Sequence, residues 1–254
     1  MNNNGSKESE SRIGLLGEWI KSTDNIVFFG GAGVSTESGI PDFRSVDGLY
    51  NQKYDFPPET ILSHSFFCNH ISEFYRFYKD KMLHLDKKPN KAHYALARME
   101  KSGKLKAVAT QNIDGLHQAA GSVNVFELHG SVHRNYCISC RKLFNAEYIR
   151  DFDGIPACDE CGHLIKPDVV LYEEGLNSAV LNGAIKAVSE ADMLIVGGTS
   201  LSVYPASGLI NYFHGSKLVL INKTPTDYDS RADLLIQDSI GYALDKACGI
   251  AGIE

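Results

Sequence analysis

A glycine-rich stretch, residues 30–45, carries groups suited to binding a nucleotide. It follows an apolar run at residues 25–29, which predicts a short buried strand. Gly31 and Gly33 allow a tight turn close to a pyrophosphate, and free N–H groups beyond Ser35 would face anionic oxygens. The third glycine of a dinucleotide fingerprint is absent, because that position holds Thr36. On these residues alone, an ordinary strand–helix turn remains an alternative.

A second group of polar side chains follows the strand predicted at residues 105–110. Gln111, Asn112 and Asp114 come directly after this strand, and His129 follows another apolar run at residues 125–128. Polar groups at the carboxyl ends of parallel strands occupy the position where α/β sheets bind ligands. Asn112 and Asp114 are also common turn formers, and a histidine before a glycine could be a purely structural residue. The residue types alone leave both interpretations open.

Four cysteines form two Cys-x-x-Cys pairs separated by seventeen residues, which is the pattern of a zinc site. Because four thiolates complete a tetrahedral shell, the expected zinc ion is structural and not catalytic. Two disulfides or a redox pair are the alternatives. The remaining Cys68 and Cys248 are expected to be buried small hydrophobic residues. The four expected zinc ligands are Cys137, Cys140, Cys158 and Cys161.

Three strings of this sequence resemble those of the sirtuins, the NAD-dependent protein lysine deacylases. The family pattern is close to GAG(I/V)SxxSGIPDFR, and residues 31–44 read GAGVSTESGIPDFR. The sirtuin strings TQNID, followed by a histidine, and ELHG are intact at residues 110–117 and 127–130. The resemblance runs from about Ile13 to the end of the chain, with the motifs in family order. It implies a bacterial-type NAD-dependent protein deacetylase that yields nicotinamide and O-acyl-ADP-ribose.

The resemblance also implies roles for individual residues. His129 would act as the general base on the ribose hydroxyls, Asn112 would orient ribose or water, and Asp114 would bind the nicotinamide carboxamide. The substrate lysine would bind along Val170 and Tyr172. Further contacts to NAD are implied for Ala32, Gly33, Thr36, Phe43, Arg44, Gln111, Ile113, Thr199, Ser200, Asn222 and Ile240.

Residues 166–174 depart from the sirtuin pattern RPxVVxFGE, since they read KPDVVLYEE. Glu173 replaces the family glycine and adds a carboxylate beside the expected peptide cleft. With Glu174 it could form an acidic rim that attracts basic residues flanking the substrate lysine. A solvated turn without influence on substrates is the alternative. We expect this departure to alter substrate preference and not to abolish activity.

Apolar strands that alternate with helices predict the scaffold for these groups, a Rossmann-like, doubly wound parallel sheet of the α/β class. We assign residues 12–46, 85–130 and 166–254 to this NAD-binding domain. Residues 47–84 and 131–165 are assigned to a smaller helical and zinc-ribbon module, and residues 1–11 to a flexible tail. Single helices are expected at residues 12–22, 66–84, 89–101, 178–190, 203–213 and 240–248.

Composition narrows the function further. The 254 residues are 43% hydrophobic, enough for a large core, and the formal charge of −6 argues against nucleic acid or acidic membranes as partners. No signal peptide or membrane span is recognisable, and paired cysteines suit a reducing compartment, so we expect a cytoplasmic protein. The expected partners are proteins or peptides with acylated lysines. The alternatives are an NAD-dependent ADP-ribosyltransferase or NAD glycohydrolase on the same fold, and a zinc-ribbon binding module with a vestigial nucleotide site.

Overall fold

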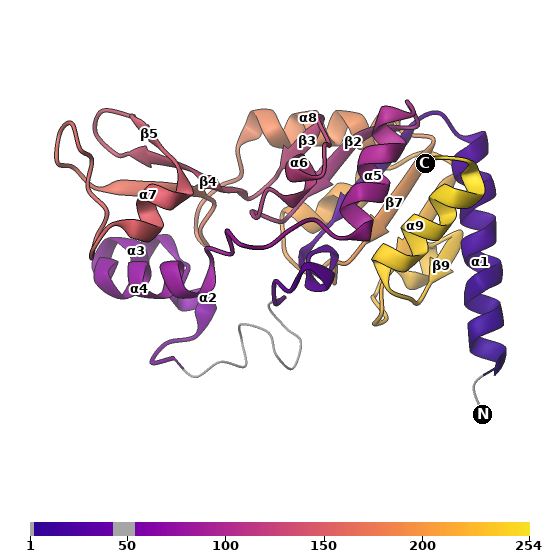
Figure 1. Ribbon diagram of the computed structural model, residues 1–254, viewed down its shortest axis with the longest axis horizontal. Helices are drawn as coiled ribbons and strands as arrows, with labels where there is room; N and C mark the ends of the chain where they lie inside the picture. The colour runs from indigo at the N-terminus through magenta and orange to yellow at the C-terminus, as the bar shows by residue number, and fades with distance from the viewer. Residues whose placement is uncertain (1–2, 43–53) are drawn as a thin grey trace.

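The computed structural model describes residues 3–42 and 54–254, and its largest element is a six-stranded parallel sheet. The strand order is β3-β2-β1-β7-β8-β9, and Figure 1 labels β3, β2, β7 and β9 of this sheet. The central strands β1 (Ile26–Gly30) and β7 (Met193–Gly197) are buried along their whole length, as their continuous apolar sequences predict. The other strands are β2 (Leu105–Thr110), β3 (Val125–Glu127), β8 (Lys217–Ile221) and β9 (Leu234–Ile236).

Helices cover both faces of this sheet, which confirms the doubly wound α/β fold. In β1, Ile26 and Phe28 belong to the core under one layer of helices, whereas Val27 and Phe29 belong to the core under the other. This alternation follows from the two-residue period of a strand. The first layer contains α1 (Asn3–Ser22), α5 (Lys91–Lys101) and α9 (Ile240–Ala251). The second contains α8 (Ser178–Glu190) and the 3-10 helix η4 (Ala206–Tyr212).

A second unit lies beside the large sheet, at the left in Figure 1, and has a core of its own. Its antiparallel sheet has the order β5-β4-β6. Aromatic side chains of α4, including Phe74, Tyr75 and Tyr78, fill its core. Its strands are β4 (Gly130–Cys137), β5 (Leu143–Phe144) and β6 (Ile165–Val169). Its helices are α2 (Pro58–Ile61), α3 (His64–Asn69), α4 (Ile71–Lys81) and α7 (Ala146–Asp151).

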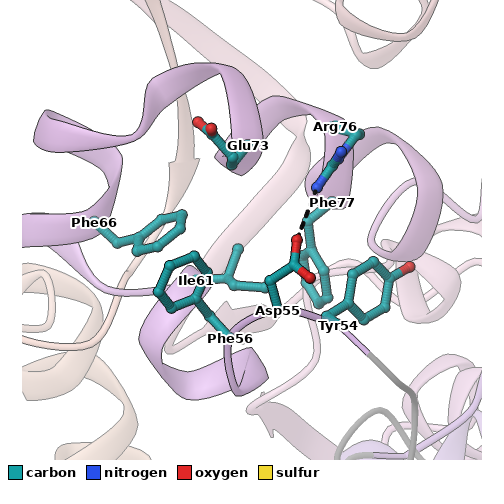
Figure 2. Close-up of a pocket in the computed structure, with 8 residues that line it drawn as sticks. All are labelled: Tyr54, Asp55, Phe56, Ile61, Phe66, Glu73, Arg76 and Phe77. Atoms are coloured by element: carbon teal, nitrogen blue, oxygen red, sulfur yellow. Dashed lines mark ion pairs between the residues drawn. The ribbon is translucent and has the colours of Figure 1, made fainter.

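An aromatic pocket in this unit lies between α2, α3 and α4. Phe56, Ile61, Phe66 and Phe77 surround it, as Figure 2 shows. It encloses about 10 Å³, which is room for one water molecule at most. We therefore assign this pocket no ligand.

Several expectations on local structure were wrong. The segment expected to be a flexible tail is helical from Asn3, and contacts further along α1 tie it to the large unit: Ser9 bonds Asp238, and Arg12 donates to the carbonyl oxygen of Leu235. The single helix expected at residues 66–84 is divided into α3 and α4, since His70 between them has non-helical dihedral angles. The helix expected at 203–213 is the shorter 3-10 helix η4. Cys68 is exposed, whereas Cys248 is buried as expected.

Candidate active site

Two glycine turns meet where the strand order of the large sheet reverses. The chain leaves β1 toward β2 on one side, while β7 lies on the other side, and open α/β sheets bind ligands at this point. The turns touch through their backbones, since the Gly33 N–H donates to the Gly198 carbonyl at 2.8 Å. A side chain on Gly198 would lie 2.4 Å from the Val34 nitrogen, so only glycine fits there.

The residues expected at this turn lie in two short 3-10 helices after β1, η1 (Ala32–Val34) and η2 (Thr36–Ser38). Thr36 Oγ1 donates to the Gly33 carbonyl at 2.9 Å and so stabilises the turn. The expected contacts Phe43 and Arg44 lie outside the described residues.

A buried serine joins the glycine turn after β1 to the polar group after β2, since these two strands are neighbours in the sheet. Ser35 is 1% exposed, and its Oγ donates to Asp114 Oδ2 at 2.6 Å. The same oxygen accepts a hydrogen bond from Asn112 Nδ2 at 3.0 Å. The second carboxylate oxygen of Asp114 accepts the Leu116 N–H at 2.9 Å, so Asp114 is fixed from two sides. Ser35 was missing from the predicted site residues, although its fixed position in the glycine-loop pattern was a signal that could have found it.

The side-chain amides of Gln111 and Asn222, near this cluster, have N–H groups without hydrogen-bond partners among the described residues. Gln111 Oε1 accepts from Thr199 Oγ1, and Asn222 Oδ1 accepts from the Thr199 N–H, both at 3.1 Å. The amide nitrogens of Gln111 and Asn222 are buried, and among the described residues neither has a hydrogen-bond partner. Buried donors without partners are costly. A polar ligand at the turn would satisfy them, and this fits a dinucleotide.

Two further residues expected to contact NAD, Ser200 and Ile240, differ in their surroundings. Ser200 is exposed beside Ser202, with 2.7 Å between the hydroxyl oxygens. Ile240 is 4% exposed, belongs to the core and packs beneath Gly197, where an added Cβ would meet its Cδ1 at 2.3 Å. Ile240 therefore shapes the floor of this edge of the sheet.

His129 follows the end of β3, and its ring orientation is set by the backbone. Its Nδ1 lies 2.9 Å from the carbonyl oxygen of Gln111, so Nδ1 carries the proton and Nε2 has a free lone pair. Burial lowers the pKa of His129, and the bond to Gln111 opposes this shift. The ring is therefore neutral at neutral pH and able to accept a proton.

The expected peptide-binding segment starts next to His129. The Val170 N–H donates to the His129 carbonyl at 2.9 Å, whereas Ile113, from the polar string, accepts the Val132 N–H at 3.0 Å. Tyr172 is held against the second unit, since its N–H donates to Leu62 and its carbonyl accepts from the His64 N–H.

Glu173, which was expected to contribute to an acidic rim, is hydrogen-bonded to α3. Its carboxylate accepts the Ser65 N–H at 2.8 Å and the Ser65 hydroxyl at 2.9 Å. Glu174 is paired with Lys166 at 3.1 Å and with His64 at 2.8 Å. Both carboxylates bond to residues of α3 and so hold the segment against this helix, and an effect of their charge on substrates stays a prediction.

The four paired cysteines gather into one cluster, with all four sulfur atoms within 4.8 Å of one another. All four are free thiols, which removes the disulfide alternative. The sulfur atoms of Cys137 and Cys161 lie 3.4 Å apart, and those of Cys140 and Cys158 lie 3.6 Å apart. Tetrahedral zinc with Zn–S bonds of about 2.3 Å separates its ligands by about 3.8 Å. The cluster therefore fits one structural zinc ion.

Basic residues beside the zinc cluster are partly neutralised. Lys142 Nζ lies 2.8 Å from both Asp159 and Glu160.

In the described part of the chain, no helix combines the length and the apolar character needed to span a bilayer.

Comparison with known proteins identifies the class to which this fold and site belong. The model of the Sir2 family matches residues 31–205. An NAD-dependent protein deacetylase from Clostridium acetobutylicum is 61% identical over 237 residues, which cover 92% of this chain and 97% of the relative. A protein of the same name from Cutibacterium acnes is 52% identical over 231 residues, with 90% and 94% covered.

Solved structures agree with this assignment. One, described as "Structural Basis for the Mechanism and Regulation of Sir2 Enzymes", has a TM-score of 0.86 and 40% identity, with 96% of this chain and 98% of that chain covered. Another, described as "Sir2-p53 peptide-NAD+", has a TM-score of 0.82 and 40% identity, with 93% and 97% covered. This chain belongs to the Sir2 family, the sirtuins.

Proposed function

We propose that this protein is an NAD-dependent protein deacetylase that removes acyl groups from lysine side chains of proteins or peptides. The products are nicotinamide, the free lysine and O-acyl-ADP-ribose. The observation that carries the proposal is the Ser35–Asn112–Asp114 cluster beside His129, at the switch point of the sheet. The relatives from Clostridium and Cutibacterium carry the same activity in their names.

In this proposal the residues of the site divide the work of binding. Asp114, fixed by Ser35 and Leu116, receives the nicotinamide carboxamide, with Ile113 next to it in the chain. Phe43, which lies outside the described residues, is assigned to the same pocket from the sequence motif. Ala32, Gly33, Thr36 and Arg44 hold the pyrophosphate and the adjoining ribose. The spare amide donors of Gln111 and Asn222, with Thr199, Ser200 and Ile240, hold the adenosine half.

Proton transfer falls to His129, because its Nε2 is free and its ring is neutral. When bound, NAD supplies the electrophilic ribose carbon and the ADP-ribose that accepts the acyl group. His129 takes a proton from a ribose hydroxyl at Nε2, and Asn112 orients the ribose or a water molecule. The Val170 carbonyl accepts the N–H of the substrate lysine, and Tyr172 borders the same segment.

The two units bind different reactants. The domain of residues 12–46, 85–130 and 166–254, without the residues of β6, binds NAD. The module of residues 47–84 and 131–165, to which β6 also belongs through its pairing with β4, presents the peptide segment. The zinc ion keeps the module folded and takes no part in the reaction. A cytoplasmic location suits free thiol ligands and an intracellular NAD supply.

A product assay tests this function. The purified, zinc-loaded protein is incubated with NAD and an acetyl-lysine peptide, and the products are identified by mass spectrometry. We expect free peptide lysine and O-acetyl-ADP-ribose in equal amounts, with a loss of about 100-fold or more in His129→Ala. His214→Ala, which changes an exposed histidine, is the matched control. Free ADP-ribose alone would indicate an NAD glycohydrolase, and ADP-ribosylated protein a transferase.

A further inference from the structure

A cysteine, a histidine and a carboxylate are linked in series at α3, outside the proposed catalytic site. Cys68 Sγ lies 3.5 Å from His64 Nε2, and His64 Nδ1 lies 2.8 Å from Glu174 Oε1. Cys68 is exposed, and the His64 side chain is 52% exposed. Because these residues are four apart on one helix, they share a face, whereas Phe66 turns into the aromatic pocket (Figure 2). A nucleophile, a base and a group that orients the base are thus in contact.

We propose that Cys68 is a thiol modification site for low-molecular-weight disulfides, with His64 as its base. Glu174 accepts the proton of His64 Nδ1, so the Nε2 lone pair faces the thiol. His64 takes the thiol proton, the Cys68 sulfur attacks one sulfur of the disulfide, and the S–S bond breaks. The second sulfur leaves as a thiolate, which the proton then neutralises. One disulfide is exchanged for another, and no other oxidant is required.

The other cysteines are poor competitors for this reaction. Cys248 is buried, and its thiol lies 3.7 Å from the Ala95 carbonyl. The thiols of the four-cysteine cluster are committed to the metal. Cys68 is therefore the accessible thiol of the zinc-loaded protein.

The same three residues are connected to the proposed peptide-binding segment, so this part of the inference rests on the proposed function. The other oxygen of Glu174 accepts the Leu171 N–H at 3.0 Å, and the His64 N–H donates to the Tyr172 carbonyl at 3.0 Å. A group attached to Cys68 occupies the space of the His64 ring and separates it from Glu174. Modification therefore loosens the segment that holds the substrate and leaves the NAD contacts of the large sheet in place.

The reactivity is tested with the full-length, zinc-loaded protein and the aromatic disulfide 5,5′-dithiobis(2-nitrobenzoate) at neutral pH. We expect one label per chain, mapped by mass spectrometry to Cys68. An unassisted thiol is only a few per cent ionised at neutral pH, so labelling should be about five- to thirtyfold slower in His64→Gln. The matched control is His70→Gln, since the ring of His70 contacts Phe56 and Phe66 and, among the described residues, has no bond to Cys68. An equal rate in His64→Gln, or labelling of the zinc ligands first, would overturn the proposal.

The coupling is tested on the labelled enzyme after excess reagent is removed. We expect the KM for an acetyl-lysine peptide to rise about two- to fivefold, as for the loss of one partly exposed hydrogen bond, with the KM for NAD unchanged. A small monothiol should restore the original value, and Cys68→Ser treated in the same way should show no change. An unchanged peptide KM would overturn the coupling. If the unlabelled enzyme had no deacetylase activity, the proposed function would fail, and the labelling rates would still decide the reactivity of Cys68.

Discussion

The hydroxyl of Ser35 donates to the carboxylate of Asp114 at 2.6 Å and joins the glycine turn after β1 to the polar string after β2. The two residues are 79 positions apart in the chain. The bond fixes the orientation of the Asp114 carboxylate within the proposed site.

Loss of this hydroxyl should impair catalysis more than folding. A hydrogen bond to a charged group contributes about 1.5–3 kcal/mol, so we expect kcat/KM of Ser35→Ala to fall roughly 10- to 100-fold. Steady-state kinetics with peptide and NAD measure this change. Ser38→Ala is the control. Ser38 belongs to the same turn as Ser35, but its hydroxyl accepts a hydrogen bond from Asn90 and, among the described residues, has no bond to Asp114. Equal losses in both variants would contradict the assigned role.

The acid limb of the pH profile should report on His129. Because burial lowers its pKa, the ring stays neutral to a lower pH than an ordinary histidine. We expect the midpoint of the acid limb of kcat/KM to lie below about 6.5. The profile is recorded with thermal unfolding at each pH, to separate titration from denaturation. A midpoint clearly above the ordinary histidine value would contradict a buried neutral base.

A second histidine should make the fold sensitive to acid. His117 is 1% exposed, and burial lowers its pKa to about 3, with neighbouring His93 acting in the same direction. Between pH 6.5 and 3 the unfolded chain binds a proton that the folded chain excludes, so the free energy of unfolding decreases as pH falls, by up to about 1.4 kcal/mol per pH unit.

Replacement of His117 by leucine tests this linkage, because neither ring nitrogen has a hydrogen-bond partner among the described residues. We expect the loss of stability between pH 7 and pH 5, measured by urea unfolding, to be about 2 kcal/mol smaller in His117→Leu. Exposed His214→Gln should retain the wild-type loss. The same loss in wild type and His117→Leu would show that His117 does not resist protonation.

Zinc removal should unfold the second unit. Structural zinc contributes about 10–16 kcal/mol in isolated fingers, more than a sheet as short as β5-β4-β6 provides alone. Cys158→Ala should therefore lose its metal, become sensitive to protease between residues 131 and 165, and lose deacetylase activity. Metal analysis and limited proteolysis measure this, with Cys68→Ser as the control outside the cluster. An active, metal-free protein would refute the structural role.

Replacement of Glu173 by glycine should reduce the stability of the fold less than replacement by alanine. Its φ of 75° is left-handed, which costs a residue with a side chain about 1–2 kcal/mol. Both substitutions lose the bonds to Ser65, but only glycine removes this cost. We expect Glu173→Gly to be about 1 kcal/mol more stable than Glu173→Ala in urea unfolding. Because the carboxylate is occupied, we also expect Glu173→Gly to keep the ranking of peptides with flanking Arg or Glu. A reordered ranking at low salt would restore the acidic rim.

Sequence patterns predicted most of what depends on neighbouring residues. The runs IVFFG and MLIVG became the buried central strands, since a parallel strand covered on both faces requires continuous apolar residues. The spacing of the two cysteine pairs predicted the four-sulfur cluster, because each Cys-x-x-Cys turn brings its own thiols together.

Only the tertiary structure decided which distant groups meet. The carboxylate of Glu173 accepts a hydrogen bond from Ser65, 108 positions away in the chain. Glu173, which the sequence presented only as a charge beside the cleft, therefore also connects two distant segments. Cys68 was expected in the core, but α3 buries Phe66 and Phe67, and Cys68 lies exposed beside His64. Local sequence patterns predict the preferences of one strand, turn or helix. Contacts such as Ser35–Asp114 form only because the strand order places the carboxyl ends of β1 and β2 side by side at one edge of the sheet.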